Sequence, residues 1–295
     1  METPDLETLF TEIARYAAQR RAADAERIHR PAATYAEQLE RFRLPVQDDG
    51  VPADQVIREL IAFAEPGLAA ITSPRFYGWV VGCSNGTGVA ADGLTGLWGR
   101  NAGNHLATPS AAAAEEQAGL ALLDLLDLPR ESSVGFVTGA TMANFTCLAA
   151  ARGEVLRRAG WDVEADGLFG APPITVILGE EAHSTVFAAI KYLGLGAQRV
   201  VKVDVDRNGA MIPAAFADAI ARASGPIIVI AQAGQINTGA FDPFVAIAQA
   251  VRAKGGWLHI DGAFGLWARA TKTHRHLGEG LERAAAWAVD WHTRL

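Results

Sequence analysis

The residues best suited to chemistry follow directly after short apolar segments. Thr138-Gly-Ala-Thr141 opens a predicted helix, where backbone amides and the Thr141 hydroxyl are placed to bind an anion such as a phosphate. His183 follows a second segment, and its flat imidazole is suited to stacking on an aromatic ligand. Asp261 follows a third, where an unpaired carboxylate is costly and a protonated ring nitrogen would be a good partner. These positions predict a site for a phosphorylated ring.

Each of these residues also has a structural interpretation, which the pattern alone leaves open. The segment beginning at Thr138 has the residues of an ordinary helix N-terminus. A lone histidine such as His183 is more often structural than functional. The Asp261 carboxylate can cap the backbone of Gly262 and Ala263. The functional interpretation therefore depends on whether the fold brings these side chains together.

An alternation of short strands and helices must position these side chains. The apolar, β-branched runs predict strands at residues 134–137, 174–178, 199–203, 227–230, 257–260 and 287–289. Helical spacing predicts helices at residues 110–127, 141–159, 184–193, 213–223 and 243–254. This order indicates an α/β fold with a mostly parallel sheet and helices on both faces. Ligands bind such sheets beyond the C-terminal ends of the strands, where the candidate residues lie.

The N-terminal part of the chain has a different pattern. Residues 4–20 and 53–65 have helical spacing, and polar residues separate them. This stretch is too thin to form a core of its own. We therefore predict a helical N-terminal arm of residues 1–70, packed on the rest of the protein or on a second subunit, and a large domain of residues 71–295.

Composition narrows the class of protein. The formal charge of −7 argues against nucleic acid and anionic membranes as partners. The acidic start METPDLETLF is unlike a signal peptide, and no apolar run has the length of a membrane span. The two cysteines, Cys83 and Cys147, form no CxxC motif. A cytoplasmic protein without a disulfide framework is the expectation.

Seven segments, in this order, resemble the group II pyridoxal-phosphate decarboxylases, the family of aromatic-amino-acid and glutamate decarboxylases. The resemblance runs from about residue 50 to residue 292, and HIDGAFG and AGQINTGAFDP are its most specific pieces. The segments are SPRFYGWVVG, NAGNHLATPSAAAAEE, TGATMANFTCLAAAR, EEAHSTV, AQAGQINTGAFDP, WLHIDGAFGLWA and WAVDWH.

The resemblance implies a fold-type I large domain, pyridoxal 5'-phosphate as cofactor, an amino-acid substrate and a homodimer. It implies that His183 stacks on the pyridine ring and that Asp261 pairs with the ring nitrogen. It also implies that Ala140, Thr141 and His292 lie near the cofactor phosphate. Further contacts with the cofactor are implied for Gln235, Asn237 and Ala263.

One position departs from the family pattern. The family has D-x-H-K, whose lysine forms a Schiff base with the cofactor, whereas this chain reads Asp290-Trp291-His292-Thr293. A threonine hydroxyl cannot replace that amine. Lys272 is a poor substitute because it lies in a polar loop. We expect a C-terminally truncated decarboxylase that is inactive alone, and the alternative is a non-catalytic cofactor-binding pseudoenzyme or dimerisation partner.

Three other motifs suggest different chemistry. Ser84 lies in a G-x-S-x-G pattern, as in serine hydrolases, but only helices precede it and no HGGG-like segment is present. Gly194-Leu-Gly196 is expected to be a turn, because it precedes a strand and lacks the third glycine of a dinucleotide site. Four possible metal ligands lie in the last third of the chain, but we do not expect them to form a metal site. They are His259, Asp261, His274 and His276.

Overall fold

A computed structural model describes residues 5–46, 48–79, 81–82, 84–99 and 101–290. The chain forms two compact units, one extending to Gly88 and the other beginning at Val89. The division into an arm of residues 1–70 and a domain of residues 71–295 stays a prediction. In the described part, no helix is both long and apolar enough to cross a membrane.

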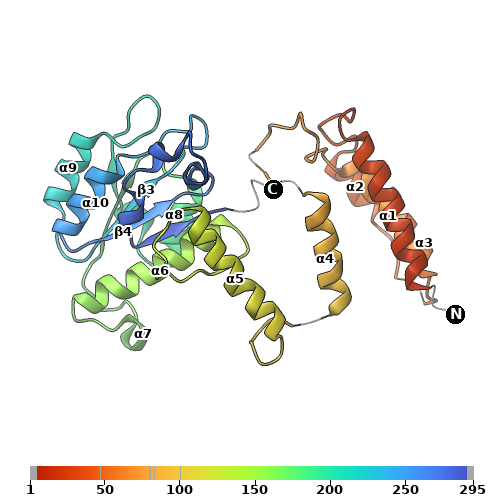
Figure 1. Ribbon diagram of the computed structural model, residues 1–295, viewed down its shortest axis with the longest axis horizontal. Coiled ribbons are helices and arrows are strands. Elements are labelled where there is room, and N and C mark those ends of the chain that lie inside the picture. Colours follow the sequence, from red (N-terminus) through yellow and green to blue (C-terminus); the bar gives the residue numbers. More distant parts are fainter. Residues whose placement is uncertain (1–4, 47, 80, 83, 100, 291–295) are drawn as a thin grey trace. The chain divides into compact units, whose positions relative to one another are not determined.

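The first unit is helical, and its helices α1 and α3 lie side by side (Figure 1). Asp5 caps α1. Thr34 caps α2 in a capping box, in which the Thr34 and Glu37 side chains each accept a hydrogen bond from the other residue's backbone N–H. None of the residues in these helices is buried. The elements are α1 (Leu6–Ala23), α2 (Tyr35–Arg41), α3 (Ala53–Ala64) and the 3-10 helix η1 (Glu65–Gly67).

The second unit contains a five-stranded parallel sheet in the order β2-β1-β3-β4-β5. Its strands are β1 (Thr175–Gly179), β2 (Val201–Val203), β3 (Ile227–Gln232), β4 (Trp257–Asp261) and β5 (Ala286–Ala288). The helices of the chain from residue 86 on are α4 (Gly86–Trp98), α5 (Pro109–Leu125), α6 (Ala140–Arg158), α7 (Val163–Asp166), α8 (Ser184–Tyr192), α9 (Pro213–Arg222) and α10 (Phe244–Ala253). Short 3-10 helices are η2 (Ala197–Arg199), η3 (Gly265–Ala270), η4 (Arg275–Gly278) and η5 (Leu281–Arg283).

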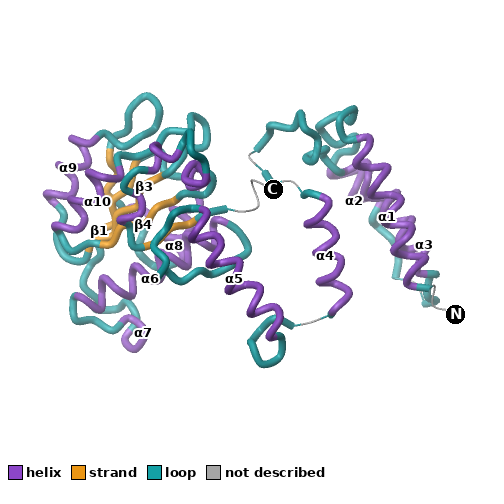
Figure 2. Tube along the Cα trace, in the orientation of Figure 1, coloured by secondary structure: helices purple, strands orange, loops and turns teal. Residues whose placement is uncertain are grey.

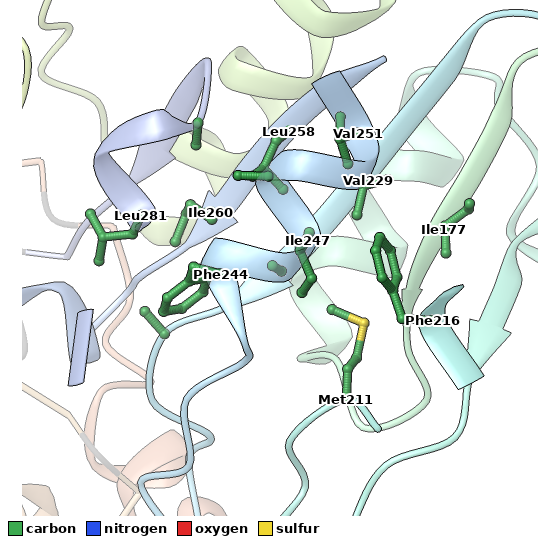
Figure 3. Close-up of a cluster of buried hydrophobic side chains, with 14 of the residues drawn as sticks. Ile177, Met211, Phe216, Val229, Phe244, Ile247, Val251, Leu258, Ile260 and Leu281 are labelled. Carbon is green, nitrogen blue, oxygen red and sulfur yellow. The ribbon is translucent and has the colours of Figure 1, made fainter. Parts of the chain in front are cut away.

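Helices cover both faces of this sheet (Figures 1 and 2). Alternate residues of each strand point to opposite faces. Ile228 and Ile230 of β3 therefore pack with α6 and α8, whereas Val229 packs with α9 and α10. The larger cluster, on the α9 and α10 face, includes Phe244 (Figure 3). The predicted parallel α/β architecture is confirmed.

The strand expected at residues 134–137 is wrong, because the structure has no strand there. Val134, Phe136 and Val137 are 37%, 50% and 41% exposed. Backbone pairing makes a strand, and apolar composition alone does not supply a partner. Among the described strands, β5 pairs with β4 and with no other.

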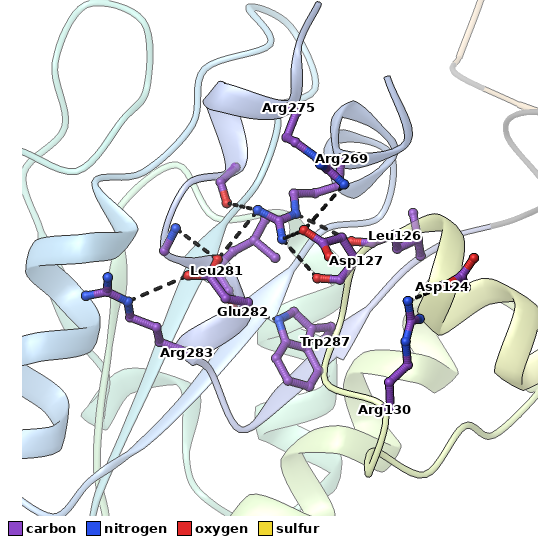
Figure 4. Close-up of polar contacts among 12 residues, drawn as sticks. Asp124, Leu126, Asp127, Arg130, Arg269, Arg275, Leu281, Glu282, Arg283 and Trp287 are labelled. Carbon is purple, nitrogen blue, oxygen red and sulfur yellow. Dashed lines mark hydrogen bonds and ion pairs between the residues drawn. The ribbon is translucent and has the colours of Figure 1, made fainter. Parts of the chain in front are cut away.

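A buried arginine joins the end of α5 to the segment after β4 (Figure 4). Arg269 is 7% exposed, and its guanidinium donates to the backbone oxygens of Leu126, Asp127 and Gly278. It also forms ion pairs with Asp127 at 2.7 Å and Glu282 at 3.5 Å. The five donors of arginine suit such a crowded site, where several carbonyls converge.

Candidate cofactor site

Three candidate residues, His183, Gln235 and Asp261, lie at or after the C-terminal ends of β1, β3 and β4. A small cavity at this edge is lined by Glu181 after β1, by Gln232 at the end of β3 and by Asp261 at the end of β4. The parallel register places Gln232 beside Asp261. This edge is where ligands bind in open parallel sheets, as the sequence predicts.

Asp261 is a buried carboxylate with no lysine or arginine partner in the described part of the chain. It is 4% exposed, and its Oδ1 accepts a 3.3 Å hydrogen bond from the Ala263 backbone N–H. Burial raises the pKa of Asp261, while the Ala263 N–H, the charge of His183 and the Asn144 amide oppose that rise. A buried carboxylate of this kind is suited to a cationic ligand group.

His183 is half-buried and is the N-cap of α8. Its Nδ1 accepts from the Thr185 backbone N–H at 3.3 Å and lies 2.8 Å from the Thr185 hydroxyl. One ring nitrogen of His183 therefore has a structural role, because it caps the helix. The charge of His183 is also one of the influences that lower the pKa of Asp261.

The predicted anion-binding element lies at the N-terminus of α6. Gly139 is its N-cap with φ of 153°, a conformation that L side chains rarely adopt, and no side chain caps the helix there. The first N–H groups of a helix have no intrahelical acceptor, so those of Ala140 and Thr141 are available to an anion. Thr141 is exposed, and a Cβ at Gly139 would meet no atom within 4 Å.

Hydrogen bonds to the Gln235 side chain stabilise the loop after β3. The Gln235 Oε1 accepts from the backbone N–H groups of Asn237 at 2.6 Å and Thr238 at 3.0 Å, and its Nε2 donates to Glu181 at 3.2 Å. The Gln235 carboxamide is therefore engaged within the loop, and Asn237 is exposed. Their roles in cofactor binding stay predictions.

The remaining predicted contacts lie after β4 and β5. Ala263 is half-buried, and its backbone carbonyl accepts from the Asp290 N–H at 2.8 Å, which joins the loops after β4 and β5. His292 and Thr293 lie outside the described residues.

Three polar residues at this edge were not assigned to the cofactor site from the sequence. Asn144 and His259 are fully buried, and Asn144 Oδ1 lies 2.8 Å from His259 Nε2. Asp242 lines the same cavity as Asp261 and accepts from the backbone N–H groups of Met211 and Gln232. The signals were present, because Asn144 lies three residues after Thr141 and His259 shares a strand face with Asp261.

Comparison with known protein families assigns the chain to one of them. The description of the matching family is pyridoxal-dependent decarboxylase conserved domain, and residues 36–293 match it. This chain belongs to the pyridoxal-dependent decarboxylase family. The resemblance identified from the sequence motifs is therefore confirmed, and pyridoxal phosphate is the family's cofactor.

Individual relatives agree with this assignment. The chain is 37% identical to rat cysteine sulfinic acid decarboxylase over 138 residues, which are 45% of this chain and 28% of the relative. It is 32% identical to L-2,4-diaminobutyrate decarboxylase of Rhizobium meliloti over 195 residues, which are 64% of this chain and 36% of the relative. The match thus spans about a third or less of these curated relatives.

Solved structures show that the fold is that of the fold-type I large domain. Mouse CSAD in apo form superposes with a TM-score of 0.85 at 25% identity, covering 96% of this chain and 60% of that one. Oryza sativa TDC with PLP and tryptamine gives a TM-score of 0.87 at 22% identity, covering 99% and 64%.

The alternative motifs gain no support from their surroundings. Ser84 is exposed, and Arg21 donates 2.7 Å and 2.6 Å hydrogen bonds to its carbonyl and hydroxyl oxygens. Gly194 and Gly196 both have positive φ and lie between α8 and β2, as expected of a turn. Among the described residues, no group of three or more histidine, cysteine or acidic side chains is arranged to hold a metal ion.

Proposed function

We propose that this chain forms the cofactor-binding part of a pyridoxal-phosphate-dependent amino-acid decarboxylase. The observation that carries the proposal is the buried Asp261 carboxylate, which has no lysine or arginine partner in the described chain and whose pKa the charge of His183 lowers. The protonated nitrogen of a pyridine ring fits that carboxylate. The open N-terminus of α6 fits the phosphate of the same cofactor.

Each residue has a distinct part in holding the cofactor. Asp261 holds a proton on the ring nitrogen, and His183 and Ala263 contact the ring. The α6 amides of Ala140 and Thr141 bind the phosphate, with His292 nearby. Pyridoxal phosphate, when bound, supplies a conjugated ring that accepts the electron pair left at Cα when an amino acid loses CO₂. By keeping the ring cationic, Asp261 strengthens that capacity.

We further propose that this chain alone binds the cofactor without a covalent bond and does not decarboxylate. Thr293 occupies the position of the family's lysine, and its hydroxyl forms no imine. This residue also favours a second candidate function, a non-catalytic cofactor-binding partner of a complete relative. For either function we propose a cytoplasmic homodimer and, for the enzyme, an amino-acid substrate.

A calorimetric titration with pyridoxal phosphate tests the proposal. Saturable binding is expected, weakened about tenfold or more by Asp261→Asn because a charged partner of the ring is lost. The surface variant Asp218→Asn is the matched control, since Asp218 is exposed on α9. Equal affinities for all three chains would contradict the assignment of Asp261.

Borohydride treatment followed by mass spectrometry tests the absence of a covalent bond. We expect the cofactor to be removed by dialysis both before and after reduction. A stoichiometric cofactor adduct on any of the four lysines, which are Lys191, Lys202, Lys254 and Lys272, would show that another amine replaces the family's lysine.

A further inference from the structure

Asn144 and His259 form a buried polar pair that the proposed cofactor contacts do not use. Both side chains are 0% exposed, and Asn144 Oδ1 lies 2.8 Å from His259 Nε2. Asn144 belongs to α6, one turn after Thr141, and His259 belongs to β4. Two buried polar groups at the same edge as the candidate site require a reason, since burial without partners is costly.

The Asn144 amide and the Asp261 carboxylate lie on the same side of the sheet. His259 and Asp261 are two residues apart on β4, so they point to the same face of the sheet, the one that α6 covers. The amide helps to lower the pKa of Asp261. The Asn144 Nδ2 is buried and has no hydrogen-bond partner within the described chain.

His259 fixes which end of the Asn144 amide faces Asp261. Burial lowers the pKa of His259 to about 4, so the imidazole is neutral at neutral pH. A neutral ring with its proton on Nε2 donates to Asn144 Oδ1 and leaves Nδ1 bare. His259 Nδ1 has no hydrogen-bond partner in the described chain, which agrees with this tautomer, although the Ala286 backbone opposes the fall in the pKa of His259. Once Oδ1 accepts from His259, Nδ2 is the end left for Asp261.

We propose that Asn144 is a positioning residue, oriented by His259, whose Nδ2–H group faces Asp261 and keeps that carboxylate ionised for a cationic ligand. The proposed function identifies the ligand as the cofactor ring. The arrangement of the three side chains does not depend on that identity. An isolated buried carboxylate tends to take up a proton and lose its attraction for a cation, and a neighbouring N–H donor opposes that tendency.

Other titratable groups lie around Asp261. His183 lowers the pKa of Asp261. Cys147 of α6 is neutral at physiological pH, because burial and the Asp261 charge raise its pKa to about 11. Glu181 and Asp242 line the same cavity as Asp261. A donor that carries no charge of its own is therefore useful at this position.

The test is a pH titration of the cofactor-free chain, labelled with ¹³C in its aspartate carboxyl groups. The Asp261 signal is assigned by its loss in Asp261→Asn. We expect Asn144→Leu to raise the pKa of Asp261 by about one unit or more, because the donor is removed. Asn144→Asp should raise it further by adding a negative charge. Cys147→Ala, buried on the same helix, is the control and should leave the pKa within error of the wild-type value.

The histidine tautomer gives a second readout that a purely space-filling role would not affect. In the wild-type chain, ¹⁵N spectra should show the proton of His259 on Nε2. A proton on Nδ1, or an unchanged Asp261 pKa in folded Asn144→Leu, would overturn the proposal. If Asn144→Leu does not fold, the wild-type tautomer decides. Failure of pyridoxal phosphate to bind, with these shifts observed, would contradict the proposed function and not this inference.

Discussion

Gly265 packs directly against the backbone of Ala233. A Cβ atom on Gly265 would lie 2.0 Å from the Ala233 carbonyl oxygen and 2.4 Å from its carbonyl carbon. This contact locks the loop after β4 to the loop after β3, and it does so without a side chain. The two loops that flank the candidate site are therefore held at a distance that only glycine permits.

Gly265→Ala should lower the free energy of unfolding by about 2 kcal/mol or more, because neither backbone segment can move without disturbing its strand. Urea denaturation measures the change. Gly153→Ala is the matched control, since a Cβ there meets no atom within 4 Å and alanine favours the helix. Equal stabilities of the two variants would show that the loops separate easily.

The sequence predicted the sheet well because its strands are short, mostly apolar runs. Ile227–Gln232 and Trp257–Asp261 have this character, and both are strands. Residues 134–137 have it too, but strand formation needs a neighbouring backbone, which a local pattern cannot reveal. The pairing of Asn144 with His259 joins residues 115 positions apart and depends on how α6 packs on β4.

Arg269→Lys should destabilise the second unit by about 2 kcal/mol or more. A lysine cannot serve the three carbonyl oxygens and the Asp127 carboxylate together, so buried acceptors lose their donors. Arg130→Lys is the control, because Arg130 pairs with Asp124 at an exposed site. Thermal denaturation should separate the two variants, and equal midpoints would contradict a structural role for Arg269.

Asp242 should make stability depend on pH. Burial raises the pKa of Asp242 to about 6 from an ordinary value of 3.8, against the opposing backbone N–H groups of Met211 and Gln232. The folded chain therefore binds this proton more tightly than the unfolded chain. Stability from this group is greatest below about pH 4, falls as the pH rises through 6, and then levels off.

The size of that effect is measured against Asp242→Asn, which does not titrate. Between pH 4 and pH 6.5, the stability of the wild-type chain relative to the variant should fall by up to about 3 kcal/mol, at about 1.4 kcal/mol per unit of pKa. Asp261 titrates in both chains, so its contribution cancels. A constant difference across this range would mean that Asp242 is ionised throughout.

Thr141→Glu should weaken pyridoxal phosphate binding about tenfold, because a carboxylate at the α6 N-terminus repels the phosphate. Binding of pyridoxal, which lacks the phosphate, should change little. Thr146→Glu is the control, as Thr146 is exposed further along the same helix. Fluorescence titration measures all three chains. A parallel loss for both ligands in Thr141→Glu would place the phosphate elsewhere.

The central claim is that Asp261 holds a proton on the ring nitrogen of pyridoxal phosphate. The most direct measurement is the ¹⁵N chemical shift of the ring nitrogen when ring-labelled cofactor is bound to the chain. The wild-type chain should show a protonated nitrogen at neutral pH, and Asp261→Asn, still folded by circular dichroism, should show an unprotonated one. The same ring-nitrogen shift in both chains would contradict the account.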